Sequence, residues 1–243
     1  MNFTLRSYQK ELLDADDIPF PEIKKNMQEL DTINTWLGGH AITRAGFKLV
    51  VSPTSYRDRE SGVNASKNQL KVCEIGCGGG DNLAMLLRWA RKNSLNIDCI
   101  GVDIKKECID FAAARWKNEP IEWIISDYRK TEFKQKPDII FSSLFCHHFT
   151  QEEMVEQLKW MSENCKLGFF INDLHRHPLA YYSIKFLTQV FSKSKLVKND
   201  APLSVARGFK KKDWEWLANQ SGLNSISIQW KWAFRYLIVY RNG

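Results

Sequence analysis

The sequence has no CxxC pair of cysteines. Its 6 cysteines stand apart, at positions 73, 77, 99, 108, 146 and 165. Most of them lie in or beside apolar runs, where a free cysteine packs like a small hydrophobic side chain. We therefore expect buried, reduced thiols, and neither a disulfide framework nor a cysteine-ligated metal.

Long apolar segments are also lacking. No stretch has the roughly 18 apolar residues that a membrane-spanning helix needs. The first residues, MNFTLRSYQKELLDADD, have no apolar core of the kind found in export signals. Together with reduced thiols, which persist in the cytosol, these absences predict a cytoplasmic protein without a transmembrane segment.

Long runs of one charge are absent as well, although the formal net charge is +7 and the sequence pI is near 9.0. The basic clusters, at Lys24-Lys25, Lys105-Lys106 and residues 210–212, are short, and none forms an arm or a tail. A solvated basic surface accounts for them, so we expect no stable nucleic-acid partner and a monomer or a homodimer. The net charge leaves attraction to RNA open as an alternative.

The 243 residues, 44% of them hydrophobic, suffice for one core and predict a single domain. From residue 71 onwards, short apolar runs alternate with helical patterns, which predicts an α/β protein with a buried parallel sheet. The expected strands are VCEIG, DCIGVDI, IEWIIS, DIIFSSLF and LGFFIND, and the expected helices cover 81–93, 105–118 and 150–163. The two runs in SISIQWKWAFRYLIVYR are too close for a crossover helix and should pair as an antiparallel hairpin.

Three further segments flank or interrupt this sheet. Apolar residues recur at helical spacing over residues 8–50, with a break at the IPFPE turn and a stop at Gly38-Gly39. Residues 52–69 are polar and contain proline and glycine, as connectors do. After residue 173 we expect a helical stretch over 178–199, then a polar loop, then a helix that Gly222 closes.

The most informative stretch is VCEIGCGGGDNLAML, residues 72–86, in which four glycines join a strand to a helix. Such a turn offers a ligand backbone N–H groups and the positive end of a helix dipole, and glycine permits close approach and positive φ. The Walker loop needs Lys followed by Ser or Thr, where this chain has Asp81-Asn82, and the dinucleotide fingerprint needs glycine at position 81. A nucleoside triphosphate and a dinucleotide are therefore disfavoured.

What remains is Glu74-x-Gly76-x-Gly78-x-Gly80, which resembles motif I of the class I S-adenosylmethionine (SAM)-dependent methyltransferases. The next strands end in acids where that family binds the ribose and the adenine of SAM, and the strand at 138–145 resembles its motif IV. The resemblance implies a Rossmann-like class I methyltransferase fold, with a mostly parallel seven-stranded sheet that ends in an antiparallel hairpin. It implies SAM as the cofactor, bound by Glu74, Gly76, Cys77, Gly78, Gly80, Asp103, Ile104, Asp127, Tyr128 and Ser143.

The outer segments resemble those of bacterial small-molecule methyltransferases of the ubiquinone/menaquinone type. This resemblance is carried by ELLDADDIPFPEIKKNMQELDTINTWLGG, NDLHRHPLAYYSIKFLT and APLSVARGFKKKDWEWL. It implies an apolar aromatic, quinol or polyketide-like acceptor. We accordingly divide the single domain, 1–243, into an N-terminal helical cap over 1–50, a SAM-binding core over 70–173 and 213–243, and a helical insertion after strand five, 174–212, that forms a substrate lid.

Because SAM carries the activated methyl group, the protein has to align the acceptor and manage one proton. For a phenol or an acidic carbon, a histidine is the natural base. Two pairs follow the fourth and fifth predicted strands, His147-His148 and His175 with His177. Neighbouring side chains on a helix or strand point apart, so we expect at most one of each pair to face the acceptor. We favour His148, then His175, keep His147 as a candidate, and assign Arg176 as an orienting charge.

No acidic residue lies at ligand spacing from these histidines in the sequence, so we expect no metal site. Residues 142–145 read SSLF and lack the Asp/Asn-Pro-Pro-Tyr type of motif of amino-methyltransferases, which disfavours methylation of DNA bases. The expected reaction is in-line transfer of the methyl group to a hydroxyl, or less favourably to a carbon, with a histidine base. An RNA- or protein-directed methyltransferase and an inactive SAM-binding partner subunit are the alternatives.

Overall fold

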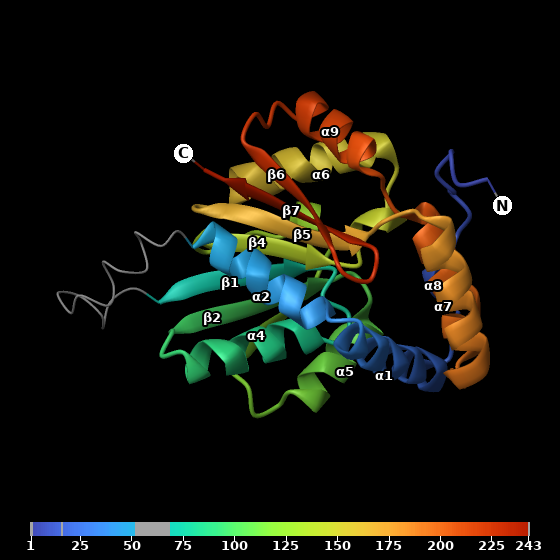
Figure 1. Cartoon of the computed structure of the whole chain (residues 1–243). Coiled ribbons are helices and arrows are strands. Elements are labelled where there is room, and N and C mark those ends of the chain that lie inside the picture. The colour runs from blue at the N-terminus through green and yellow to red at the C-terminus, as the bar shows by residue number, and fades with distance from the viewer. Residues whose placement is uncertain (1, 16, 52–68, 243) are drawn as a thin grey trace.

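A computed structural model describes residues 2–15, 17–51 and 69–242, and within these ranges the chain forms one seven-stranded sheet (Figure 1). The strands are β1 (Leu70–Ile75), β2 (Ile97–Asp103), β3 (Ile121–Ile125), β4 (Ile139–Ser143), β5 (Gly168–Leu174), β6 (Ile226–Lys231) and β7 (Arg235–Arg241). Their order is β3-β2-β1-β4-β5-β7-β6, and β1 to β5 are parallel. The predicted α/β class and the five expected parallel strands are confirmed.

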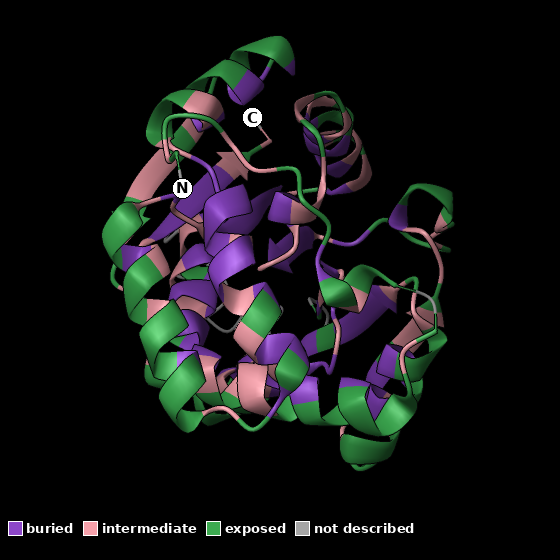
Figure 2. Ribbon diagram, turned by 90° about the vertical axis from the view of Figure 1, so that its right-hand side faces the viewer, coloured by how far each residue is buried: buried purple, intermediate pink, exposed green. Residues whose placement is uncertain are grey.

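Helices cover both faces of the sheet. They are α2 (Gly39–Val50), α4 (Asp81–Lys92), α5 (Lys106–Arg115), α6 (Gln151–Asn164) and α9 (Lys211–Gln220), and three of them, α4, α5 and α6, lie in crossovers between parallel strands. α2, α4 and α5 share one core with the sheet, which includes the buried side chains of Phe47 and Leu83. α6 and α9 share a second core on the opposite face, with Leu158 and Trp214. Figure 2 shows the buried residues between these layers.

β6 and β7 form the predicted antiparallel hairpin. Residues 232–234 connect them, and Ala233 and Phe234 have positive φ angles of 61° and 54°. β7 lies between β5 and β6 and is antiparallel to both, so that Leu174 pairs with Arg235. This register places Arg235 at the edge of the sheet where the parallel strands have their carboxyl ends.

The N-terminal segment is helical from α1 (Phe20–Trp36) onwards. The predicted stop at Gly38-Gly39 is the end of α1, because Gly38 has a φ of 75° and α2 begins at the next residue. The predicted helix is wrong over residues 8–11, 15 and 17, and in the described part of the segment only a 3-10 turn, η1 (Leu12–Asp14), precedes α1. The backbone N–H groups of Leu12 and Leu13 donate instead to the Asp200 carboxylate. The predicted connector at 52–69 falls on residues outside the described ranges, except for its last position.

The insertion between β5 and β6 contains α7 (Pro178–Phe191), α8 (Lys195–Arg207) and α9. The predicted loop after residue 199 is wrong, because α8 continues through Pro202 to Arg207. Tertiary contacts of α8 outweigh the low helix propensity of proline. Leu203 is buried, and the carboxylate of Asp200 accepts hydrogen bonds from the backbone of η1. α7 and α8 stand beside α1 at the carboxyl ends of the parallel strands (Figure 1).

All six cysteines are free and buried, as predicted. Burial raises the pKa of the Cys77 thiol well above its usual range. The backbone N–H of Cys77 donates to the carbonyl of Val102 at 3.1 Å. Among the helices of the described residues, none is both long and apolar enough to cross a bilayer.

Candidate active site

The glycine-rich turn joins β1 to α4 at the carboxyl edge of the sheet. Gly76, Gly78 and Gly80 have positive φ angles of 65°, 50° and 72°. A β-carbon at Gly76 would collide with the ring of Phe145, and one at Gly80 with that of Trp123. At Gly78, by contrast, no atom of the described chain lies within 4 Å of the place that a β-carbon would take. Gly76 and Gly80 are therefore packed against aromatic side chains of the protein. The space beside Gly78 is free, so a ligand can approach the backbone there.

Alanine substitutions should distinguish the packed position Gly76 from the open position Gly78. Gly76→Ala combines backbone strain with a collision in the core and should lower the free energy of unfolding by about 2–5 kcal/mol. Gly78→Ala carries the strain alone, about 1–2 kcal/mol, but its methyl group enters the open side and should weaken SAM binding. Urea unfolding and calorimetry measure the two effects. Equal stability losses, or an unchanged SAM affinity in Gly78→Ala, would contradict this description.

Glu74 lies in β1 just before the turn and is only 1% exposed. Its Oε1 accepts a hydrogen bond from Nδ2 of Asn82 at 3.2 Å, and its Oε2 has no hydrogen-bond partner within the described ranges. Burial raises the pKa of Glu74 well above its usual range. A buried carboxyl group with one unsatisfied oxygen is suited to accept a donor from a ligand.

Asp103 ends β2, and its carboxylate accepts two backbone hydrogen bonds. Oδ2 accepts from the N–H of Gly78 and Oδ1 from that of Lys105, both at 2.9 Å. Burial raises the pKa of Asp103, whereas these two hydrogen bonds and the charges of Lys105 and His148 oppose the rise. Each oxygen keeps a lone pair, so the carboxylate can also accept from two vicinal hydroxyl groups. The next side chain, Ile104, is 66% exposed and offers an apolar surface beside them.

The remaining predicted cofactor contacts already have partners in the protein. The carboxylate of Asp127 accepts hydrogen bonds from the side chain and the backbone N–H of Arg129. The hydroxyl of Ser143, at the end of β4, accepts one from Asn172 at 3.3 Å. The ring of Tyr128 is buried in an aromatic cluster with Phe145, Phe149 and Trp160.

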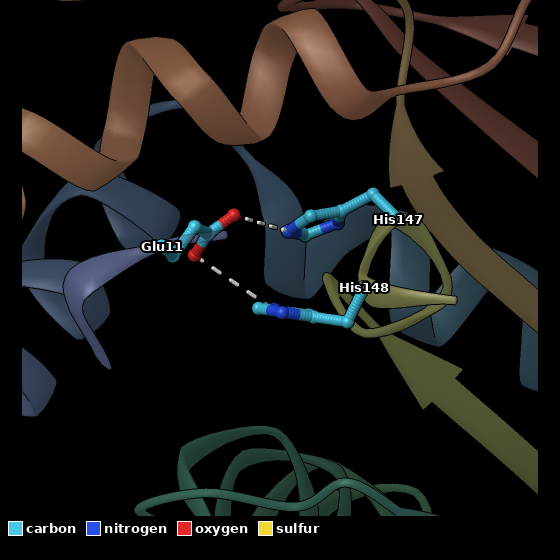
Figure 3. Close-up of side chains that lie close together, drawn as sticks. All are labelled: Glu11, His147 and His148. Carbon is cyan, nitrogen blue, oxygen red and sulfur yellow. Dashed lines mark ion pairs between the residues drawn. The ribbon is translucent and has the colours of Figure 1, made fainter. Parts of the chain in front are cut away.

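His147 and His148 follow β4 in the 3-10 turn η3 (Cys146–His148), and both rings face Glu11 (Figure 3). Nδ1 of His147 lies 2.8 Å from Oδ1 of Asp173. Because this carboxylate can only accept, Nδ1 carries the proton, and Nε2 lies 3.6 Å from Oε1 of Glu11. Nε2 of His148 lies 3.9 Å from Oε2 of the same carboxyl group. The two neighbouring rings do not point apart, because both bend to one side of the turn with centroids 4.4 Å apart.

Glu11 reaches the histidines from the N-terminal segment, and α8 holds the two parts together. Oγ of Ser204 donates to Oε1 of Glu11 at 2.7 Å. Arg207 donates to the carbonyls of His147 and His148 at 3.0 and 2.8 Å. Burial raises the pKa of Glu11, against the charge of His148 and the hydrogen bond of Ser204. The centre therefore depends on three segments that are far apart in the sequence.

Asp173 organises the centre from β5, where it is fully buried. Its Oδ2 accepts the N–H of Cys146 at 2.7 Å, and its Oδ1 accepts both Nδ1 of His147 and the N–H of Leu174. Burial alone would raise the pKa of Asp173, but the charge and the hydrogen bond of His147 hold it below its usual range. Asp173 was not among the residues predicted from the sequence, although an acid within an apolar strand is a usable signal.

Arg235 is a second buried charge that the sequence analysis missed, since an arginine at a hairpin belongs to no motif. It is 2% exposed, and its Nε and Nη1 have no hydrogen-bond partner in the part of the chain that is described. Burial lowers the pKa of Arg235 to about 10, against the charges of Asp173 and Asp81. A guanidinium buried without a bound carboxylate is suited to an anionic group of a ligand.

The other two candidates, His175 and Arg176, have different surroundings. His175 packs against the rings of His177 and Tyr236, and burial lowers its pKa to about 4. The guanidinium of Arg176 is buried and donates to the carbonyls of Phe3 and Gly208 and to the carboxylate of Asp213. Arg176 therefore ties the N-terminal segment to the start of α9.

A cavity of about 430 Å³ lies outside this centre, between α1, α2, α4 and α5. It is lined in part by His40, whose Nε2 lies 3.3 Å from Asp31 and 3.7 Å from Asp81. Burial tends to lower the pKa of His40, but the hydrogen bond to Asp31 and the charge of Asp81 outweigh it and raise the pKa. The cavity adjoins the first turn of α4 and is not lined by Asp103. It therefore does not coincide with the side chains at the strand ends.

These side chains lie at the carboxyl ends of the central strands, the edge at which open α/β sheets bind their ligands. Residues 72–168 match the family model of a methyltransferase domain. No protein of curated function matches the sequence.

Solved methyltransferase structures share the fold and confirm the predicted Rossmann-like class I architecture. Human N-acetylserotonin methyltransferase in complex with SAM is 18% identical, with a TM-score of 0.60 over 93% of this chain and 57% of that one. The plantazolicin methyltransferase BpumL, with a triazolic desmethylplantazolicin analogue and S-adenosylhomocysteine, is 16% identical, with a TM-score of 0.59 over 91% and 97% of the two chains. Magnesium protoporphyrin IX methyltransferase from Synechocystis PCC 6803, with bound S-adenosylhomocysteine, is 14% identical, with a TM-score of 0.50 over 80% and 82%. The family match covers residues 72–168 as a methyltransferase domain, and the solved structures agree with it in fold.

Proposed function

We propose that the protein transfers the methyl group of SAM to a hydroxyl oxygen of a small apolar molecule. The observation that carries this proposal is the proximity of two centres at one edge of the sheet. The glycine turn with Asp103 is suited to the cofactor, and Glu11, His147 and His148 form an acid–histidine centre next to it. The two centres are neighbours, because the glycine turn follows β1 and the histidine turn follows β4, which pairs with β1, and the ring of Phe145 lies against Gly76.

On the cofactor side, each part of SAM finds a matching group. The free Oε2 of Glu74 suits the ammonium group, directly or through water, and the open side of Gly78 admits the methionine end. Asp103 suits the two ribose hydroxyls, and the exposed Ile104 suits one face of the adenine. Asp127, at the end of the next strand, would receive the adenine amine. Contacts from Cys77, Tyr128 and Ser143 are part of the same proposal.

On the acceptor side, the reaction breaks the S–CH3 bond and forms an O–CH3 bond, and the hydroxyl proton has to leave. His148, which is 26% exposed in its side chain, is the accessible member of the histidine pair. The buried guanidinium of Arg235 offers a partner for the carboxylate of SAM or for an acidic group of the acceptor. The cap over 1–50 and the lid over 174–212 would enclose the acceptor, because α1 and α8 stand at this edge. Free, buried thiols favour a cytoplasmic location for the reaction.

The proposal is tested with methyl-labelled SAM and three kinds of acceptor in parallel: a panel of phenols and hydroxyquinones, bulk RNA, and bulk protein. Label in an O-methylated small molecule is the expected result. Label in RNA or protein would favour the macromolecular alternative, and binding to RNA that falls steeply with salt would accompany it. SAM binding without transfer to any acceptor would favour an inactive partner subunit.

His148→Ala should lower kcat by about 10²- to 10⁴-fold, because a positioned acid–base group contributes that much. Its dissociation constant for SAM, measured by calorimetry, should stay unchanged. His177→Ala, which removes a histidine outside the centre, is the matched control and should keep its kcat. Full activity in His148→Ala would remove this residue from the proton path.

A further inference from the structure

Glu11, His147 and His148 place three potential metal ligands around one point. The ligand atoms, one from each side chain, lie within 4.8 Å of one another. The two distances from the histidine Nε2 atoms to Glu11, 3.6 and 3.9 Å, are too long for hydrogen bonds. Ligands that share a tetrahedral ion at about 2 Å are separated by roughly 3.3 Å, so small movements would bring these atoms into coordination.

Each histidine also has a carboxylate on its other ring nitrogen. Nδ1 of His147 lies 2.8 Å from Asp173, and Nδ1 of His148 lies 3.2 Å from Asp14. Histidines that bind metals typically donate Nδ1–H to such a group, which orients the ring and directs the Nε2 lone pair to the ion. When the two histidines are neutral and keep their protons on Nδ1, both Nε2 lone pairs are directed at Glu11, whose ionised carboxylate cannot donate to them. A cation is the natural partner for all three groups.

The charges around the point also favour a cation. Glu11, Asp14 and Asp173 surround the two rings, and Asp200 is close enough to act on the carboxyl group of Glu11. The described cations nearby are Arg6, Arg207 and Arg235. Arg6 and Arg207 donate to the carbonyl of His147, Arg207 also pairs with Asp14 at 3.2 Å, and Asp173 acts on the charge of Arg235. Acids therefore outnumber the fixed positive charges.

A similar group in the same molecule shows what a satisfied cluster looks like. Nε2 of His40 faces Asp31 and Asp81, and Nδ1 lies 3.2 Å from Oδ1 of Asn82. Both ring nitrogens of His40 have acceptors within hydrogen-bond distance, unlike the Nε2 atoms of His147 and His148, so a protonated imidazole completes this cluster without a metal. The guanidinium of Arg115 further neutralises Asp31.

We propose that Glu11, His147 and His148 bind one divalent transition-metal ion, with Zn²⁺ as the best match to two imidazoles and one carboxylate. Asp173 and Asp14 orient the two histidines, and the fourth position is open on the exposed side of His148. This proposal rests on the proposed function, since the acceptor hydroxyl would fill that position. With the ion bound, His148 is a metal ligand and not the proton acceptor, so the hydroxyl would lose its proton to solvent, and the resulting oxyanion would attack the methyl group of SAM as the S–CH3 bond breaks. The sequence predicted no metal site because no acid lies at ligand spacing from these histidines. The acids of the proposed site come instead from residues 11–14 and from β5.

The test is metal binding by the full-length, untagged protein without SAM or acceptor. Metal is stripped with a chelator and the protein is titrated with Co²⁺, whose visible absorption reports tetrahedral coordination, and with Zn²⁺ by calorimetry. One ion per chain is expected. Glu11→Gln should weaken binding at least 100-fold, and Asp14→Asn, which leaves all three ligands in place, should weaken it about 10- to 100-fold. His40→Gln is the matched control and should bind as the wild type does.

No saturable binding, or binding that Glu11→Gln leaves unchanged, would overturn the proposal. Loss of binding in His40→Gln alone would move the ion to the other cluster and overturn it too. If Glu11→Gln does not fold, His148→Ala, at the more exposed ligand, replaces it in the titration. Full methyl transfer to a hydroxyl by stripped protein would overturn the site's role and leave the proposed function standing. Metal binding without transfer to any hydroxyl would overturn the proposed function and its acceptor role, while the ion site itself would be supported.

Discussion

Replacing Asp103 with asparagine is expected to weaken SAM binding by about 10²- to 10⁴-fold. The carboxylate can accept two hydrogen bonds from vicinal hydroxyls, and each bond to a charged acceptor contributes about 1.5–3 kcal/mol. Asparagine has the same shape but one acceptor oxygen, and its NH2 group would face the N–H of Gly78 or Lys105, which now donate to the carboxylate. Calorimetric titration with SAM measures the loss.

Asp98→Asn is the matched control, because Asp98 lies on the same strand at its amino end and is exposed. It should bind SAM as the wild type does. A thermal unfolding curve for each variant shows whether the fold is kept. An Asp103→Asn variant that is folded and binds SAM with unchanged affinity would refute the placement of the cofactor.

Asp173→Asn is expected to have the largest effect on stability, a loss of about 3–5 kcal/mol in the free energy of unfolding. The carboxylate of Asp173 is fully buried and accepts three backbone N–H groups together with Nδ1 of His147. An asparagine would direct its own donors at some of these donors and leave them unsatisfied. Turnover should fall as well, because His147 would lose the group that fixes its tautomer. Urea unfolding and initial-rate assays measure the two effects.

Asp138→Asn is the control for this substitution. Asp138 also accepts a backbone hydrogen bond, from the N–H of Lys71 at 2.8 Å, but at the amino end of β4 and closer to solvent. Its replacement should cost about 1 kcal/mol and leave turnover unchanged. Similar stability losses in the two variants would show that Asp173 is not the organising group of the centre.

The sheet and the glycine turn could be predicted because their signals are local. Apolar runs alternating with helical patterns identified the five parallel strands, and the short connection between the last two runs identified the hairpin. The acids that end β1, β2 and β3 were visible next to those runs, since the end of a strand follows from the end of its apolar pattern. The loop predicted after residue 199 was wrong because Pro202 is held in α8 by contacts that its own neighbours do not reveal.

The sequence by itself therefore determined the class of fold, the glycine turn and the acids at the strand ends, because each depends on residues a few positions apart. Only the tertiary structure decided the rest of the site. Glu11 meets His147 and His148 because α8 holds η1 and η3 together, and Asp173 and Arg235 acquire their roles through burial. These contacts join segments that are far apart in the sequence, so no spacing of residues along the chain indicates them. A carboxylate ten residues from the N-terminus thus becomes the partner of two histidines at the end of β4 through packing alone.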